Sequence, residues 1–291
     1  MRLPKFEYFT PKTLNEALAL LKEQGEGAYI MAGGTDIVVK MLHGRLRPKS
    51  VIALQEIDGI NKISFSPQEG LTIGATARIV NILSHPDILQ YYPALTDAVK
   101  VMANIEVRNM GTVVGNLCNA APSADTAPPL ITMGSVVVLT SLEGERRLSL
   151  DEFFKGPGIT AMNQGEIMTS VFVPLPQPRS GGSYKRISAR CGVDIAPASA
   201  GTMAVFRDEI CSDVKLVLGA VAPIPLRAYR TEDLLRGKQW TQELIQDAGY
   251  EAAEESMPIS DCRASAEWRK KMVAVLTRRT LVEAYERSRK N

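Results

Sequence analysis

Small and polar residues crowd one stretch of the chain, residues 108–130 (RNMGTVVGNLCNAAPSADTAPPL). Small side chains let another large body approach the backbone closely, and glycine also permits turns that are closed to other residues. The Asn, Thr, Ser and Asp side chains add hydrogen-bond donors and acceptors. Neither helical nor strand periodicity runs through the stretch, so we expect an ordered loop rather than a regular element. This composition suits a polar, extended ligand that carries phosphates and hydroxyls.

A second loop of the same character lies upstream at residues 32–36 (AGGTD). It follows the apolar run 28–31, a predicted buried strand, and precedes 37–41, a predicted short helix or turn. A glycine pair between a strand and a helix start can present backbone N–H groups to an anion. Such a turn by itself occurs in any α/β protein, but the two loops in one chain, in this order, are much more specific.

The pair of loops resembles the two flavin-diphosphate loops of the FAD-binding medium subunit of molybdenum hydroxylases. This is the family of the xanthine dehydrogenase and carbon monoxide dehydrogenase medium subunits. The resemblance covers nearly the whole chain and includes FEYFTPKTLNEALALL, IGATAR, GEIMTSVFVP and SAEWRKKMVAVLTRRTL. It implies an α+β fold: a two-part FAD-binding domain of the PCMH or vanillyl-alcohol-oxidase type at 1–176, with subdomains 1–56 and 57–176. A C-terminal α+β domain would follow at 182–291, with a three-stranded antiparallel sheet and helices.

The resemblance also implies a set of cofactor contacts. Gly33, Gly34 and Thr35 would line the diphosphate from one side, with Met31 and Ala32 setting the loop, and Asp36 also counts among the contacts. Thr112, Gly115 and Asn116 would meet the diphosphate from the other side, and Asn119 would lie further along the cofactor. Toward the flavin ring the contacts are Asp125, Met168 and Lys185. Two of these have plain structural alternatives, because Met168 could be ordinary strand core and Lys185 a solvated charge.

One position departs from the family pattern. The family has two adjacent glycines in the second loop, where this chain has Val114 followed by Gly115. A β-branched residue tolerates positive φ poorly, and its side chain would crowd a close diphosphate. Either residue 114 has an ordinary φ and its side chain points away, or FAD is held more weakly here.

The composition excludes several classes of protein. A length of 291 residues fits two domains, and the formal net charge of +2 suggests neither nucleic acid nor an anionic membrane as partner. No apolar run approaches the roughly 18 residues that cross a bilayer. The N-terminus has no secretory pattern, so we expect a cytoplasmic protein.

The residues that could do chemistry unaided are few. Only His43 and His85 offer imidazoles, no serine lies in a GxSxG motif, and the carboxylates are dispersed. The cysteines show no CxxC spacing, so we expect neither a zinc site nor an iron–sulfur cluster in this chain; they are Cys118, Cys191, Cys211 and Cys262. We therefore assign no catalytic side chain and no metal ligand, and expect a cofactor, FAD, to carry the chemistry.

Electron relay is the function that the resemblance implies. In the family, a molybdopterin-binding large subunit hydroxylates the substrate, and electrons pass through a small subunit with two [2Fe-2S] clusters to FAD. Reduced flavin then delivers them to NAD, oxygen or another acceptor. Two alternatives stay open: a self-contained FAD oxidoreductase similar to the enolpyruvoyl-UDP-sugar reductases, or an assembly subunit that has lost its flavin.

The surrounding elements follow from periodicity and capping signals. Thr13 and Glu16 form a capping-box pattern ahead of a helix at 14–22. With strands at 6–9, 28–32 and 50–54 this helix makes a β-α-β unit that has neither GxGxxG nor GxxxxGK[ST]. Further on we expect a hairpin at 60–75, helices at 78–83 and 94–102, strands at 135–141 and 165–174, and a linker at 174–182. The last part predicts strands at 182–187, 199–207 and 213–221, then helices at 241–254 and 265–287, the second with a core face of Met272, Val275, Leu276 and Leu281.

Overall fold

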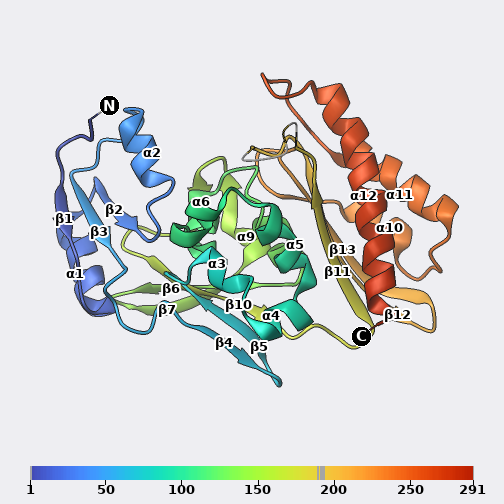
Figure 1. Ribbon diagram of the computed structural model, residues 1–291, viewed down its shortest axis with the longest axis horizontal. Helices are drawn as coiled ribbons and strands as arrows, with labels where there is room; N and C mark the ends of the chain where they lie inside the picture. The colour runs from blue at the N-terminus through green and yellow to red at the C-terminus, as the bar shows by residue number, and fades with distance from the viewer. Residues whose placement is uncertain (1, 189, 191–193, 291) are drawn as a thin grey trace.

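The three larger β-sheets follow one another along the long axis of the molecule in the computed structural model, which describes residues 2–188, 190 and 194–290 (Figure 1). The N-terminal sheet lies at one end, a central sheet in the middle, and a C-terminal sheet, flanked by the last helices, at the other end. None of the helices in these ranges combines the length and the apolar character needed to cross a bilayer.

The N-terminal sheet is parallel and has the strand order β1-β3-β2. Its elements are β1 (Glu7–Phe9), α1 (Leu14–Gln24), β2 (Ala28–Met31), α2 (Ile37–Leu42) and β3 (Ser50–Ala53). The predicted cap is present, because the Thr13 hydroxyl accepts a hydrogen bond from the Glu16 amide at 3.2 Å. The β-α-β unit predicted from the sequence is therefore confirmed.

The central sheet has five antiparallel strands in the order β4-β5-β10-β6-β7. They are β4 (Ile63–Ser66), β5 (Gly70–Gly74), β10 (Ile167–Pro174), β6 (Val136–Ser141) and β7 (Gly144–Ser149). The hairpin of β4 and β5 is as predicted. The sequence analysis missed β7, because the sequence GERRLS is polar and lies at the edge of the sheet, where no apolar alternation is required. The short elements α9 (Leu150–Phe153), β8 (Phe154–Gly156) and β9 (Ile159–Thr160) follow it.

The prediction that residues 108–130 form a loop is wrong, because much of this stretch is helical. Six short helices connect β5 to β6: α3 (Ile79–Ile82), α4 (Pro86–Tyr91), α5 (Pro93–Val101), α6 (Ile105–Met110), α7 (Val113–Asn119) and α8 (Ala127–Thr132). The last three occupy the predicted loop. Helices of six or seven residues complete fewer than two turns, so a periodicity of 3.6 residues has no room to become visible.

The C-terminal sheet is antiparallel and has four strands, not the predicted three. Its elements are β11 (Ser180–Arg186), β12 (Ser199–Arg207), β13 (Ile210–Gly219), the two-residue β14 (Leu226–Arg227), α10 (Tyr229–Leu235), α11 (Gln242–Glu255) and α12 (Ala266–Ser288). On α12, Leu276 and Leu281 are buried as predicted, but Met272 and Val275 are only half-buried. The core face is turned because Val273 and Ala274 take the buried positions against the sheet.

Close backbone contact joins α12 to β11. A Cβ atom on Gly181 would lie 1.9 Å from the carbonyl oxygen of Ala284, so only glycine allows this approach. On the other face of the same sheet, α8 packs against β12 and β13. The C-terminal sheet is therefore covered by helices from both halves of the chain.

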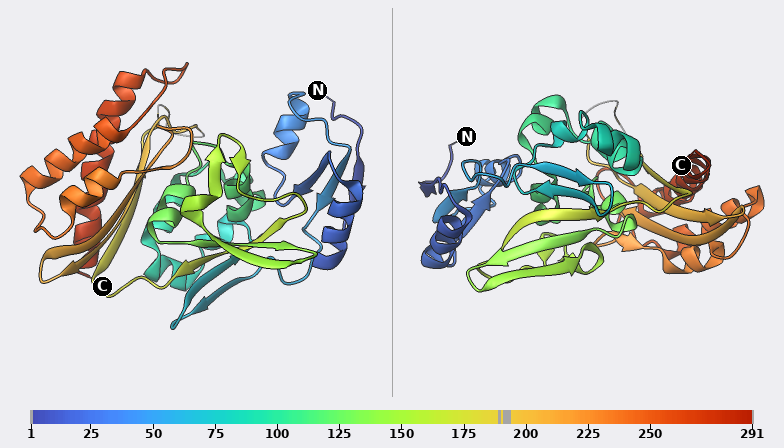
Figure 2. Two further views of the ribbon diagram at one scale, coloured as in Figure 1. Left: turned by 180° about the vertical axis from the view of Figure 1, so that it is seen from behind. Right: turned by 90° about the horizontal axis from the view of Figure 1, so that it is seen from below.

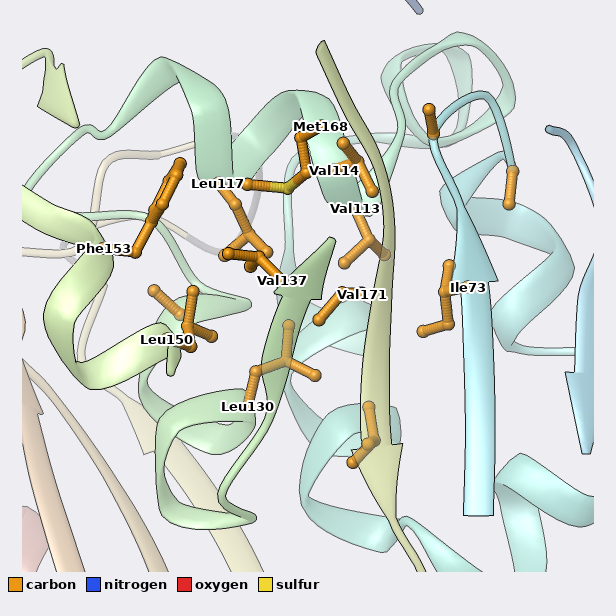
Figure 3. Close-up of a cluster of buried hydrophobic side chains, with 14 of the residues drawn as sticks. Ile73, Val113, Val114, Leu117, Leu130, Val137, Leu150, Phe153, Met168 and Val171 are labelled. Atoms are coloured by element: carbon orange, nitrogen blue, oxygen red, sulfur yellow. The ribbon is translucent and has the colours of Figure 1, made fainter. Parts of the chain in front are cut away.

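The main hydrophobic core unites the N-terminal and central sheets. It includes Leu18 of α1, Ile52 of β3 and Val171 of β10 in one cluster. Figure 3 shows how Met168 of β10 points toward Val114 and Leu117 of α7. Figure 2 shows from two sides that α12 lies at the far end of the molecule from the N-terminal sheet. The region between these ends holds the candidate site.

Candidate functional site

A cavity of about 750 Å³ brings the two predicted loops together. Every predicted cofactor contact except Lys185 lines it: Met31, Ala32, Gly33, Gly34, Thr35, Asp36, Thr112, Gly115, Asn116, Asn119, Asp125 and Met168. A volume of this size lies in the upper part of the range of roughly 300–1,000 Å³ typical of small-molecule sites. The cavity is thus large enough for an extended ligand.

The first loop lies directly against the end of α6. A Cβ atom on Gly33 would lie 2.1 Å from the carbonyl oxygen of Met110 and 2.7 Å from Cα of Gly111, so no larger residue fits. Within the described part of the chain, the N–H groups of Gly33, Gly34 and Thr35 have no hydrogen-bond partner. Free amides at a glycine turn are the donors that a phosphate accepts from.

The second loop owes its shape to the start of α7. Thr112 is the N-cap, and its hydroxyl accepts a hydrogen bond from the Gly115 amide at 2.9 Å. A Cβ on Gly115 would lie 2.8 Å from that hydroxyl oxygen. Asn116 accepts a hydrogen bond from the Thr126 hydroxyl at 2.7 Å, which fixes its amide in the cavity wall.

Val114 lies within α7 and does not have a positive φ. Its side chain is buried in the main core beside Met168 and Leu117 (Figure 3). A β-branched residue is therefore accommodated here without backbone strain. Residue 114 therefore has the ordinary φ of the first alternative, and it also lines the cavity.

Two side chains of α2 and its N-cap reach across to the end of α7. Asn119 donates from Nδ2 to Oδ1 of Asp36 at 3.1 Å, although the two residues are 83 positions apart in the sequence. Lys40 donates from Nζ to Oδ1 of Asn119 at 2.6 Å. Asp36 is exposed overall, but partial desolvation raises the pKa of its carboxyl, and Lys40 opposes that shift. The sequence analysis did not single out Lys40, which also lines the cavity.

Toward the other end of the cavity, Met168 is at once core and lining. The pairing of β10 with β6 shifts register between Met168 and Ser170, in the strand that packs against α7. Cys118 is half-buried nearby with Sγ 3.9 Å from Sδ of Met162, and desolvation raises the pKa of its thiol to about 12. The wall here is apolar, as a planar ring system would require.

A buried ion pair lies in the same part of the cavity. Asp125 accepts hydrogen bonds from the Tyr184 hydroxyl at 2.6 Å and from Nη1 of Arg186 at 2.8 Å. The side chains of Asp125 and Arg186 are only 8% and 6% exposed. Burial raises the pKa of Asp125 despite the opposing effect of Arg186 and Tyr184, and burial together with the Asp125 charge raises that of Tyr184.

Lys185 lies between these two partners on β11 but faces the other way. Its ammonium pairs with Glu283 of α12, and it does not line the cavity. Successive side chains of a strand point to opposite faces, so Tyr184 and Arg186 share one face and Lys185 takes the other. The sequence analysis chose Lys185 and missed Arg186; the alternation was visible in the run YKR, but not which face would meet the cavity.

The lining residues fit FAD by two tests that rest on this structure. The glycine loop offers unpaired amides at a place where Met110 excludes any side chain on Gly33. The cavity is also lined by the apolar Met168 and by the buried side chains of Asp125 and Arg186. A ligand with a diphosphate in one part and a flat ring with polar edges in another matches this distribution.

Metal-binding side chains do not gather anywhere in the described ranges. No three His, Cys, Asp or Glu side chains there come together as a metal ion would need. Cys118, Cys211 and Cys262 are free thiols, and Cys191 lies outside the described residues.

Comparison with known proteins agrees with this picture. A family model described as the FAD binding domain in molybdopterin dehydrogenase matches residues 4–176, and the CO dehydrogenase flavoprotein C-terminal domain matches residues 183–284. The chain is 31% identical to the glyceraldehyde dehydrogenase medium chain of Sulfolobus acidocaldarius, over 96% of this chain and 98% of that one. It is 30% identical to the carbon monoxide dehydrogenase medium chain of Hydrogenophaga pseudoflava, over 98% of each chain.

Solved structures resemble it equally closely. A chain of carbon monoxide dehydrogenase from Hydrogenophaga pseudoflava superimposes with a TM-score of 0.95 at 30% identity, covering 99% of both chains. A chain of quinoline 2-oxidoreductase from Pseudomonas putida 86 gives a TM-score of 0.92 at 26% identity, covering 98% of this chain and 99% of that one. The similarity extends through both halves of the molecule.

Proposed function

The chain belongs to the family of FAD-binding subunits of molybdenum hydroxylases, and from this premise we propose that it relays electrons from iron–sulfur clusters to a soluble acceptor. The observation that carries the proposal is the meeting of residues 32–36 and 112–119 across one cavity that Met168 also lines. Bound FAD would supply a centre that takes up electrons from one partner and releases them to another.

The protein's part in this proposal is to bind and position. Gly33, Gly34 and Thr35 would donate their free amides to the diphosphate, with α7 and its Thr112 cap on the opposite side. Each charge-assisted hydrogen bond of this kind contributes about 1.5–3 kcal/mol. Met168 would pack against the ring, and Asp125 with Arg186 would provide the charged groups beside it.

The donors of the electrons would be [2Fe-2S] clusters on a small partner subunit, and the substrate would be hydroxylated on a molybdopterin-binding large subunit. Support comes from the described side chains, which offer no group able to hold a metal ion. We propose the boundaries 1–176 and 182–291 for the two domains of this chain, with subdomains 1–56 and 57–176. The cytoplasmic location stays a prediction, which cell fractionation would test.

NAD is the acceptor that we propose. The charged side chains lining the cavity include the cations Lys40, Arg186, Arg190 and Arg263. Arg186, Arg190 and Arg263 come from the C-terminal half of the chain, and an anionic dinucleotide would find positive partners among these cations. Anaerobic mixing of the chemically reduced chain with NAD would produce NADH; a reduced flavin that stays unoxidised by NAD but reacts with quinones would replace this acceptor by another.

The first test is the absorption spectrum of the purified chain, with the flavin identified after denaturation. We expect stoichiometric FAD. A colourless protein that also refuses added FAD would overturn the relay function and favour a flavin-free assembly subunit. A yellow protein that oxidises a substrate without any partner would instead favour a self-contained flavoenzyme.

A pair of glycine variants tests the location of the cofactor. Gly33→Ala should lower FAD affinity at least a hundredfold, because the new Cβ would collide with the Met110 carbonyl and force the loops apart. Gly156→Ala is the matched control, since a Cβ there would meet Ile159 at an ordinary 3.5 Å. Equal FAD affinity in the two variants would place the cofactor elsewhere.

A further inference from the structure

Asp36 places a carboxylate where the proposed FAD site can least accommodate one. It follows Thr35 directly, and it lines the cavity beside the free amides of the first loop. A diphosphate bound to those amides would be repelled by this charge. The other lining carboxylates have arginine partners, since Asp125 pairs with Arg186 and Asp194 with Arg190. For Asp36, no described cation lies within ion-pair distance.

The Asp36 side chain does not cap the helix that it precedes. It occupies the N-cap of α2, a position where aspartate commonly accepts a backbone N–H, yet it makes no capping hydrogen bond. Instead it accepts from Asn119 at 3.1 Å, across the gap between the two loops. Something other than helix capping therefore determines where this carboxylate points.

Lys40 completes the arrangement. It lies four residues after Asp36 on the same face of α2, and its ammonium donates to the far side of the same Asn119 amide at 2.6 Å. The amide thus stands between a cation and an anion, with its oxygen toward the ammonium and its NH₂ toward the carboxylate. Hydrogen bonds in such a chain polarise one another, so part of the positive charge is felt at Asp36.

We infer that Lys40 is a positioning residue for FAD, which acts through Asn119 to neutralise Asp36 and to hold the two loops at a set distance. This inference rests on the proposed FAD site and adds to it a residue that the loop motifs do not contain. Without Lys40, the Asp36 charge would oppose the diphosphate and Asn119 would lose the partner that orients its amide. FAD would then leave faster.

The measurement is the rate at which FAD dissociates from the holoprotein, followed by flavin fluorescence after dilution. Lys40→Met should accelerate release about five- to tenfold at low ionic strength, and less at high salt, because exposed charges are screened. Lys5→Met removes the same charge from an exposed residue ahead of β1 that does not line the cavity, and should leave the rate unchanged. A Lys40→Met rate equal to that of the wild type would overturn the inference.

A rescue experiment separates charge neutralisation from a merely structural contact. In Lys40→Met/Asp36→Asn the carboxamide can still accept from Asn119, but the repelling charge is gone. We expect the double variant to release FAD within twofold of the wild-type rate. If it releases FAD as fast as Lys40→Met, the charge argument is wrong. A wild-type protein that holds no FAD at all would count against the proposed function instead, so the two failures are distinguishable.

Discussion

Two buried carboxylates, each paired with an arginine, behave in opposite ways. Glu166 and Asp125 have almost equally buried side chains, at 7% and 8% exposure. Yet the pKa of Glu166 is lowered, chiefly by the hydrogen bonds from Arg146, whereas burial raises the pKa of Asp125. The two shifts differ in their largest cause: hydrogen bonds from Arg146 lower the pKa of Glu166, whereas Asp125 lies deeper in the protein and desolvation outweighs its donors.

Glu166 is saturated with N–H donors. Arg146 donates from Nε at 2.6 Å and from Nη2 at 2.8 Å, and Asn163 adds its amide at 2.6 Å and its side chain at 3.2 Å. Asp125 receives one guanidinium hydrogen bond and one phenol hydrogen bond, and it faces the cavity. Groups whose charged form is left under-stabilised tend to lie at functional sites. Asp125 and Arg186 also line the cavity, whereas Glu166 and Arg146 do not, so we propose a structural role for the first pair and a ligand-binding role for the second.

The largest effect should come from Arg186→Gln. The change leaves Asp125 and Tyr184 in the buried cavity without their cation, which should lower the free energy of unfolding by about 3 kcal/mol. FAD affinity should also fall at least tenfold, because Arg186 lines the cavity. Denaturant unfolding and FAD titration measure the two effects. Adding Asp125→Asn should recover part of the stability, and a loss below 1 kcal/mol in the single variant would contradict the role given to this pair.

Arg146→Gln should lower the free energy of unfolding by less, about 2 kcal/mol. Arg146 is 38% exposed, and the two Asn163 donors would still hold Glu166. Because Arg146 does not line the cavity, the FAD dissociation constant should stay within twofold of the wild-type value. Weaker FAD binding here, comparable to that of Arg186→Gln, would remove the distinction between the two pairs.

The pH dependence should have opposite signs at the two carboxylates. Glu166, with a lowered folded pKa, contributes stability above its unfolded pKa of about 4.3 and loses it as the pH falls through the folded value. Asp125, with a raised folded pKa, is most favourable below its unfolded pKa of about 3.9, and its contribution declines as the pH rises.

The test compares wild type with Glu166→Gln and Asp125→Asn at pH 4 and pH 7, at one fixed FAD concentration. The advantage of the wild type over Glu166→Gln should grow by about 0.5 kcal/mol toward pH 7. Its advantage over Asp125→Asn should shrink over the same interval. If the advantage of the wild type changed in the same direction with pH for both variants, the contrast between the two carboxylates would be refuted.

The smallest effect should come from Lys185→Gln. Lys185 is 36% exposed and its partner Glu283 26% exposed, so the pair contributes roughly 0.5 kcal/mol. FAD affinity should not change, because the side chain faces α12. A loss of FAD as large as in Arg186→Gln would restore Lys185 to the cofactor contacts and reverse the assignment of the two faces of β11.

Local signals predicted much of the fold. The Thr13 cap, the hairpin of β4 and β5, and the strands β2, β3 and β6 each follow from hydrogen bonding or periodicity within a few residues. The sequence analysis missed α4 and α10, each of six or seven residues, because such short helices give too little periodicity. The same limit made α6, α7 and α8 look like one loop.

For the candidate site, too, some features follow from the local sequence and others only from the tertiary structure. The sequence by itself determined the chemistry: the amides of a glycine loop and a set of small and polar residues, which depend on backbone geometry nearby. Only the tertiary structure decided which residues meet, because Gly33 reaches Met110, and Asp36 reaches Asn119, across long separations in the chain. It also decided that Arg186 rather than Lys185 enters the cavity, since the face of β11 that turns inward depends on α12 covering the other. A strand's alternation is local, but what packs on each of its faces is not.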